Sequence, residues 1–169
     1  MADSQSGVLG SCVFHPVIGD RVYLACMPEA KRLIASEHRD EYHMFETSEL
    51  EYIPFCHDFG PLSLGDAHRF VNMIQNKIAR YPGKKIVYCV SDEATHLTNG
   101  VFLLGCYMVM VLGLSPDAVL SAFEDLLHLL LPYRDASLDD CDFPLPVESC
   151  WRALHRLGTC SLWIKRRRF

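Results

Sequence analysis

The fold of this chain is decided by residues 84–118, KKIVYCVSDEATHLTNGVFLLGCYMVMVLGLSPDA. The first part, 84–90, is rich in β-branched residues and is bounded by turn and polar residues, which predicts a buried strand. A polar loop follows at 91–95, and a helix that is apolar on every face is expected at about 96–112. A strand, a polar loop and a buried helix in this order indicate an α/β domain.

The apolar part of this stretch is too short to cross a membrane. It runs from Val101 to Leu114, and Gly105 and Gly113 interrupt it. A spanning helix needs about 20 consecutive apolar residues. We therefore expect a helix buried inside the domain, and no contact with a membrane.

The segments on both sides of this unit predict further strands and helices. Ser63 and Asp66 have the spacing of a capping box, and a helix is expected from there to a stop at 81–83. Ser115 and Pro116 begin another helix, as N-cap and first residue. Strands and helices in alternation predict an α/β fold, with a central sheet, flanking helices and one wholly buried helix. The remaining expected elements are strands at 17–26, 43–45 and 52–55, a short helix after Pro28, an acidic loop at 132–144 and a last helix at 147–157.

The composition fits one folded domain. Half of the 169 residues are hydrophobic and 22% are charged, which excludes a disordered chain. We expect a flexible N-terminus at 1–14, the domain at 15–158 and a basic tail at 159–169.

The net charge of −5 argues against a nucleic-acid binder. The stretch 115–150 holds eight acids and one base, which either favours a basic partner or forms a solvated surface.

The cysteines and histidines predict neither a metal site nor a cofactor site. None of the eight cysteines forms a CxxC pair, and the eight histidines form no HxH or HxxxH pair. Glycine-rich nucleotide-binding motifs are absent from the sequence. The first residues lack the basic and apolar regions of a signal peptide. We therefore expect reduced thiols and a protein of the cytoplasm or nucleus, not a secreted one.

The loop after the strand at 84–90 has the position of a phosphate-binding loop. Cysteine-dependent phosphatases use this strand, loop and helix with the pattern His-Cys-X5-Arg, in which the thiolate attacks phosphorus and the arginine binds the phosphate oxygens. Cys89 has the position of the nucleophile, but Thr95 replaces the arginine. Asp92 and Glu93 would repel a phosphate. We interpret Cys89, Ser91, Asp92 and Thr95 as a degenerate loop, with Cys89 as a packed apolar side chain.

Five stretches, two of them within residues 84–118, carry a resemblance to a known family. The chain resembles the N-terminal half of the cell-division-cycle dual-specificity phosphatases, the mitotic-exit phosphatase family, over about residues 15–157. The sequence motifs DFGPL, LxGCYMV and PYRDA, in this order and spacing, are specific to that family. The matching stretches are VIGDRVYLA (17–25), LEYIPFCHDFGPLSL (50–64), KKIVYCVSD (84–92), VFLLGCYMVMVLGLSPDA (101–118) and PYRDAS (132–137).

The resemblance implies a domain without catalytic residues of its own. In that family two phosphatase-like folds follow each other, and the second carries the catalytic cysteine and arginine. The first has an inactive loop and shapes an acidic groove for phosphoproteins with basic residues near the phosphosite. Such phosphatases act in cell division, in the nucleus, nucleolus, centrosome and spindle. Asp135, Asp139 and Asp140 are the groove candidates in this chain.

Two alternatives stay open at this point. Instead of an inactive domain that shapes a substrate groove, the chain could be a stand-alone pseudophosphatase or scaffold, or a weak phosphatase that depends on Cys89. A scaffold would associate with itself through the apolar surface that a second fold covers in the family. Besides a phosphoprotein with basic residues, the expected partners are therefore a C-terminal catalytic phosphatase domain or a second copy of the chain.

Overall fold

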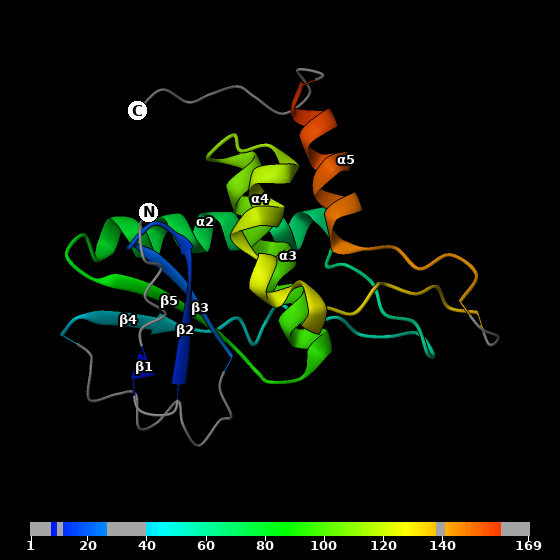
Figure 1. Ribbon diagram of the computed structural model, residues 1–169, viewed down its shortest axis with the longest axis horizontal. Coiled ribbons are helices and arrows are strands. Elements are labelled where there is room, and N and C mark those ends of the chain that lie inside the picture. Colours follow the sequence, from blue (N-terminus) through cyan, green and yellow to red (C-terminus); the bar gives the residue numbers. More distant parts are fainter. Residues whose placement is uncertain (1–7, 10–11, 27–39, 138–140, 160–169) are drawn as a thin grey trace.

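One mixed sheet and a group of helices make up the structure, a computed structural model that describes residues 8–9, 12–26, 40–137 and 141–159 (Figure 1). The sheet has five strands in the order β1-β2-β3-β5-β4. The strands are β1 (Val8–Leu9), β2 (Cys12–Ile18), β3 (Val22–Cys26), β4 (Tyr42–Phe45) and β5 (Lys85–Val90). The helices are α2 (Leu64–Arg80), α3 (Ala94–Met110), α4 (Pro116–Ala122), the 3-10 helix η2 (Glu124–Leu129) and α5 (Val147–Thr159).

The strand directions confirm the α/β fold expected from the sequence. Strands β3 and β4 both run parallel to β5. Strand β2 pairs antiparallel with β1 on one side and with β3 on the other. The parallel core of the sheet therefore brings the carboxyl ends of β3, β4 and β5 to one edge, where α/β proteins bind ligands.

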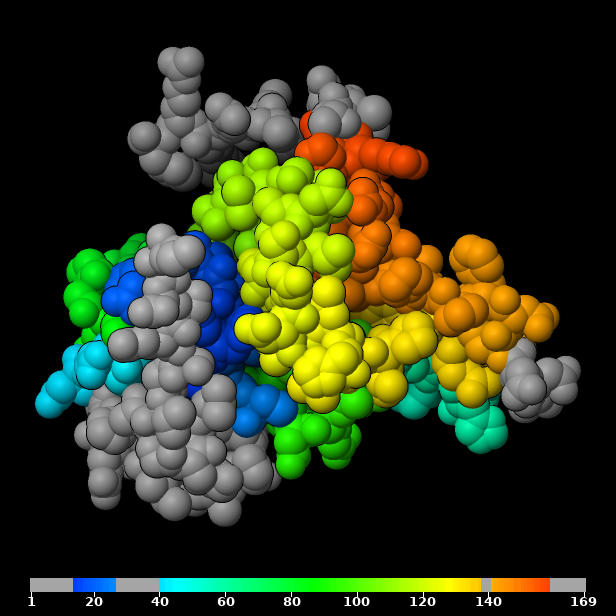
Figure 2. All heavy atoms as spheres, viewed as in Figure 1, coloured from blue at the N-terminus to red at the C-terminus, as the bar shows by residue number. Residues whose placement is uncertain are grey.

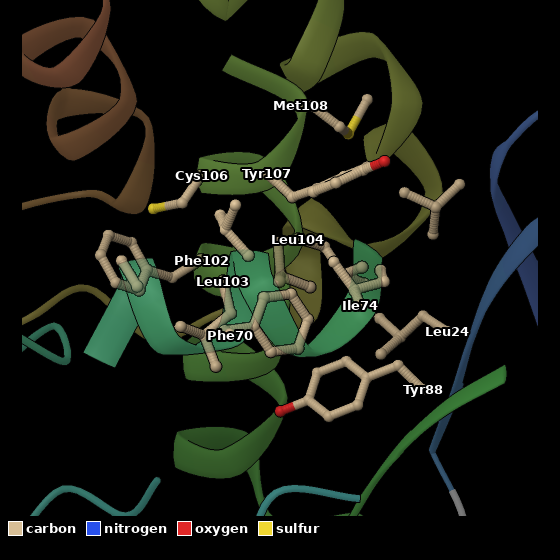
Figure 3. Packing of buried hydrophobic residues seen from close by; sticks show 14 of the residues in the cluster. Leu24, Phe70, Ile74, Tyr88, Phe102, Leu103, Leu104, Cys106, Tyr107 and Met108 are labelled. Atoms are coloured by element: carbon tan, nitrogen blue, oxygen red, sulfur yellow. The ribbon is translucent and has the colours of Figure 1, made fainter. Parts of the chain in front are cut away.

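Helix α3 is the buried helix that the sequence predicted, and it begins two residues earlier than expected. Every residue from Leu97 to Val109 is buried. The helix contacts α2, α4, α5 and β5, so it has neighbours on all sides. Figure 3 shows Phe70 and Ile74 of α2 gathered around Leu104 at the centre of this core. In the part of the chain that the structure describes, no helix is both long and apolar enough to cross a membrane.

The two faces of β5 belong to different clusters, because successive side chains of a strand point to opposite faces. Ile86, Tyr88 and Val90 pack with the helices. Val87 and Cys89 pack on the other face, in a smaller cluster that is completed by Phe14, Tyr23 and Ala25 of β2 and β3. The side chain of Cys89 thus faces away from α3.

The expected strand at 17–26 was wrong in its extent. The chain forms a hairpin in which β2 and β3 pair antiparallel, for example Phe14 with Ala25. Gly19 makes the turn with a φ of +51°, a conformation that favours glycine. The sheet also begins earlier than the domain boundary expected at residue 15, because β1 and the start of β2 lie within 1–14.

The expected strand at 52–55 was also wrong. This segment has no regular structure, since the backbone N–H groups of Phe55 and Cys56 donate to Oδ1 of Asp58 (2.8 and 2.7 Å). An aspartate that binds the backbone in this way forms a turn instead of a strand. The short helix expected after Pro28 lies outside the described residues, as does nearly all of the expected tail at 159–169.

Helices α2 and α4, before and after the buried helix, begin where the sequence indicated. The Ser115 hydroxyl caps α4 by accepting from the N–H of Ala118 (3.3 Å), and Ser63 caps α2 by accepting from the N–H of Asp66 (3.1 Å). Helix α4 ends at Ala122, and the 3-10 helix η2 follows after Phe123. The ring of Phe123 is fully buried there and stacks on Trp151 of α5 at 5.9 Å between centroids.

Candidate functional site

A cavity of about 370 Å³ lies at the carboxyl ends of β4 and β5. One wall is the irregular segment that follows β4, from Glu46 to Leu62. The other wall is the end of β5 and the first half of α3, from Thr95 to Leu103. Ligands of α/β proteins bind at this place, outside the carboxyl ends of parallel strands and next to a helix N-terminus.

Close packing of α3 on β5 shapes the inner wall of the cavity. A Cβ atom on Gly100 would lie 2.6 Å from Cγ1 of Val90, so only glycine allows this approach. The hydroxyls of Thr47 and Tyr88 are hydrogen-bonded to each other at 2.8 Å. Asn99 is buried and accepts from the hydroxyl of Tyr133 (3.1 Å). These contacts give the cavity a fixed wall of strand and helix.

The degenerate loop lies at the entrance of the cavity, but Cys89 does not present its thiol there. Cys89 is paired with Ala25 inside the sheet and is only 5% exposed. Its Sγ lies 3.9 Å from the carbonyl oxygen of Val87, on the face opposite to Tyr88. The residue borders the cavity, and its side chain packs as an apolar group with Phe14, Tyr23 and Ala25.

Ser91 is the first residue after β5 and makes contacts within the loop. Its hydroxyl is hydrogen-bonded to Nδ1 of His96 at 2.5 Å and accepts from the N–H of Glu93 at 3.4 Å. The Glu93 carboxylate lies 3.6 Å from the same His96 nitrogen. Asp92 and Glu93 are exposed and precede the first turn of α3. Two carboxylates therefore stand where the helix N-terminus would attract a phosphate.

The loop lacks the groups that phosphoryl transfer needs. Thr95 borders the cavity in the place of an arginine, and its hydroxyl cannot form a two-pronged contact with phosphate. Within the described chain, no Lys or Arg lines this cavity. Among the described residues, this loop and the cavity beside it present a buried Cys89 and no Lys or Arg.

Three carboxylates of the irregular segment line the cavity instead: Glu46, Glu51 and Asp58. Asp58 accepts from the backbone of Cys56 and from the Tyr52 hydroxyl, and these bonds lower the pKa of Asp58 to about 2. The same contact with Asp58 raises the pKa of Tyr52 to about 12. At neutral pH Asp58 is therefore charged and Tyr52 is neutral, so the cavity has a negative wall.

Asp135 lies close to this wall, although it does not line the cavity. It is exposed, and hydrogen bonds from the hydroxyl and the N–H of Ser137 lower its pKa. Its loop is held against the irregular segment by paired backbone bonds between Phe59 and Arg134 (3.1 and 2.8 Å). The teal and the yellow to orange segments accordingly lie together at the right edge of the molecule (Figures 1 and 2). Asp139 and Asp140, the other two groove candidates, lie outside the described residues.

The acidic cavity wall was missed by the sequence analysis. Glu46, Glu51 and Asp58 come from a segment without periodicity, so no helix or strand pattern brings them together. One signal was present, because residues 41–68 contain six acids and no Lys or Arg. No group of three or more His, Cys, Asp or Glu residues suited to a metal occurs in the described ranges.

Comparison with known proteins matches nearly the whole domain. The model of the family described as "Dual specificity protein phosphatase, N-terminal half" matches residues 16–157. The dual specificity protein phosphatase CDC14A of Mus musculus is 31% identical over 162 residues, covering 92% of this chain and 25% of its own. The human protein CDC14C is 35% identical over 113 residues, 64% of this chain and 25% of its own.

The similarity extends to a fungal protein. The tyrosine-protein phosphatase cdcA of Emericella nidulans is 28% identical over 141 residues, which cover 80% of this chain and 24% of its own. The chain therefore spans about a quarter of the length of the curated relatives that it matches.

Proposed function

The chain belongs to the dual-specificity protein phosphatase family of the CDC14 type, as a counterpart of the N-terminal half, and we propose that it is a catalytically inactive domain that binds phosphoproteins with basic residues near the phosphosite. In this proposal the domain binds the phosphoprotein, and another phosphatase fold hydrolyses the phosphate.

The orientation of Cys89 is the observation that carries this proposal. A nucleophilic cysteine must present a thiolate to the phosphate, and a helix N-terminus or a cation must stabilise that thiolate. Cys89 is buried among Phe14, Tyr23 and Ala25, on the sheet face opposite to the side chains of Tyr88 and Val90. The carboxylates of Asp92 and Glu93 at the start of α3 disfavour a bound phosphate as well. Together these features argue against a weak phosphatase that depends on Cys89.

The charge distribution supports the preference for basic partners. Asp135 is exposed and ionised, and it stands beside the irregular segment 46–62, which carries four acids and no Lys or Arg. We include Asp139 and Asp140, which follow on the same loop, in the proposed acidic groove. A negative surface attracts basic segments and excludes acidic ones.

Exposed apolar side chains support a second contact, with a catalytic phosphatase domain. Ile53, Phe55 and Phe143 are 86%, 91% and 77% exposed, on two loops that lie side by side. Large apolar side chains with such exposure mark interaction sites. The relatives are about four times as long as this chain, so a further phosphatase fold is the partner we propose for this surface. We place the protein in the cytoplasm or nucleus.

Titration with a pair of matched phosphopeptides tests the proposed function. The two peptides carry the same phosphoserine, followed either by arginine and lysine or by glutamine. We expect the basic peptide to bind more tightly, to bind more weakly as salt rises, and to keep its phosphate as judged by mass spectrometry. The variants Asp135→Asn and Asp139→Asn with Asp140→Asn should weaken binding. Equal affinity for both peptides would contradict the proposal.

A further inference from the structure

We propose that Asn99 is a positioning residue: it holds the loop 131–137, which carries Asp135, and the irregular segment 46–62 in one fixed arrangement. This inference rests on the proposed function, because a phosphoprotein would dock on the surface that these two parts of the chain form. It goes beyond that function by assigning a role in recognition to a side chain of the buried helix α3, which acts through the two segments.

Asn99 is an exception among the buried residues. Apart from tyrosine and cysteine, the buried side chains of the described residues are apolar except for Thr98 and Asn99. Burial of an amide costs free energy unless the amide is hydrogen-bonded. A buried polar side chain whose partners are satisfied fixes one arrangement of the groups around it. The partners of Asn99 therefore indicate what this side chain holds in place.

The two hydrogen bonds of Asn99 lead to the two segments. Its Nδ2 donates to the carbonyl oxygen of Gly60 in the irregular segment (3.4 Å). Its Oδ1 accepts from the hydroxyl of Tyr133, two residues before Asp135 (3.1 Å). Burial raises the pKa of Tyr133, so this hydroxyl keeps the proton that it donates. One side chain of α3 thus joins two segments that are far apart in the sequence.

The two segments also contact each other directly. The N–H of Phe59 donates to the carbonyl oxygen of Arg134 (3.1 Å), and the N–H of Arg134 donates to that of Phe59 (2.8 Å). The rings of Phe59 and Tyr133 lie 5.0 Å apart between centroids. Asn99 bonds to the residue after Phe59 and to the residue before Arg134, so it connects this pairing to the helix.

Thr98 gives the loop a second anchor on α3. Its hydroxyl donates to the carbonyl oxygen of Ala94 (2.7 Å) and accepts from the N–H of Leu131 (3.0 Å). The loop is therefore held to the helix at Leu131 and at Tyr133, just before the exposed Asp135. A loop that is already ordered loses less conformational freedom on binding, which raises its affinity for a partner.

The experiment replaces Asn99 with leucine, which has a similar volume and forms no side-chain hydrogen bonds. Titrations compare the matched basic and glutamine phosphopeptides on the wild-type chain and on Asn99→Leu. We expect the preference for the basic peptide to fall about fivefold, the factor for loss of one hydrogen bond. The N–H groups of Phe59 and Arg134 should exchange with deuterium faster, as measured by NMR. Tyr133→Phe removes only one of the two hydrogen bonds, so it should show a smaller change of the same kind.

The matched control is Val119→Ala. Val119 is completely buried on α4, outside the two segments, so its truncation destabilises the fold and should change the peptide preference less than twofold. Urea unfolding establishes that each variant is folded under the conditions of the titration. If Asn99→Leu does not fold, Tyr133→Phe decides the question by the same two measurements.

The outcomes separate this inference from the proposed function. If the wild-type chain prefers the basic peptide and Asn99→Leu keeps that preference, the proposed function stands and the role of Asn99 is overturned. An equal loss of preference in Val119→Ala would also overturn it, because the effect would then follow from stability. If the wild-type chain shows no preference, the proposed function fails. The exchange rates of Phe59 and Arg134 then decide alone: faster exchange in Asn99→Leu supports the positioning role, and unchanged exchange overturns it.

Discussion

The indole ring of Trp151 lies directly against the backbone of Gly105. A Cβ atom on Gly105 would lie 2.2 Å from Cε2 of this ring, closer than any side chain tolerates. The ring nitrogen donates to the carbonyl oxygen of Phe102 at 3.2 Å, and Trp151 is fully buried. One aromatic side chain thus holds α5 against the buried helix α3.

Replacing Gly105 with alanine should destabilise the protein. The added methyl group overlaps the Trp151 ring, and overpacking of this kind costs typically about 1–3 kcal/mol. Urea unfolding followed by circular dichroism measures the change. Gly83→Ala is the matched control, because nothing lies within 4 Å of a Cβ there. If both variants unfold alike, α5 does not pack on α3 as described.

Truncation of Leu104 should destabilise the core. Leu104 is completely buried on α3, so Leu104→Ala leaves a cavity and costs about 2–5 kcal/mol. Leu112→Ala serves as the control, since Leu112 is 40% exposed beyond the end of the helix. An unchanged melting temperature for Leu104→Ala would mean that α3 is peripheral.

The stability of the protein should depend on Asp58 in acid. The pKa of Asp58 in the folded protein is about 2, below the value of about 3.9 for an unfolded chain. Its contribution to stability is therefore complete above about pH 4 and is lost as the pH falls towards 2. Asp58→Asn should be less stable at neutral pH and should lose less stability over this acid range. Denaturant titrations at several pH values measure the free energy of unfolding of both proteins. Equal losses of this free energy in the wild-type chain and in Asp58→Asn would contradict the prediction.

The exposed apolar side chains should cause self-association when no second phosphatase fold covers them. Phe55 and Phe143 lie on adjacent loops, and both are more than three-quarters exposed. Sedimentation velocity should show association that rises with concentration and that Phe55→Ser with Phe143→Ser reduces. Leu129→Ser, at a half-exposed position on η2, is the control. A wild-type chain that stays monomeric at high concentration would exclude this role for the two loops.

The sequence predicted the elements whose signals are local. The apolar run in α3, the Ser63 and Ser115 caps and the β-branched run in β5 all act over a few residues. The structure has α2, β5 and α3 within two residues of their expected limits, and α4 begins at the expected residue. The hairpin was missed because β2 and β3 are both apolar, although Gly19 and Asp20 between them are typical turn residues.

The candidate site depended on information that is not local. Glu46 and Asp58 approach the same cavity only because the irregular segment folds back across the sheet edge, and no periodicity predicts that path. The orientation of the Cys89 side chain could have been predicted from the sequence. Tyr88 and Val90 face the helices, so the two-residue period of a strand assigns Cys89 to the opposite face.

The most direct test of the account is phosphate release by the purified chain from an aryl phosphate and from phosphotyrosine and phosphoserine peptides. The account predicts a rate equal to that of Cys89→Ser and of buffer alone, because the Cys89 thiol is buried inside the sheet and no arginine of the described residues lines the cavity. Turnover above background that is abolished by Cys89→Ser would show a working nucleophile and would contradict the account.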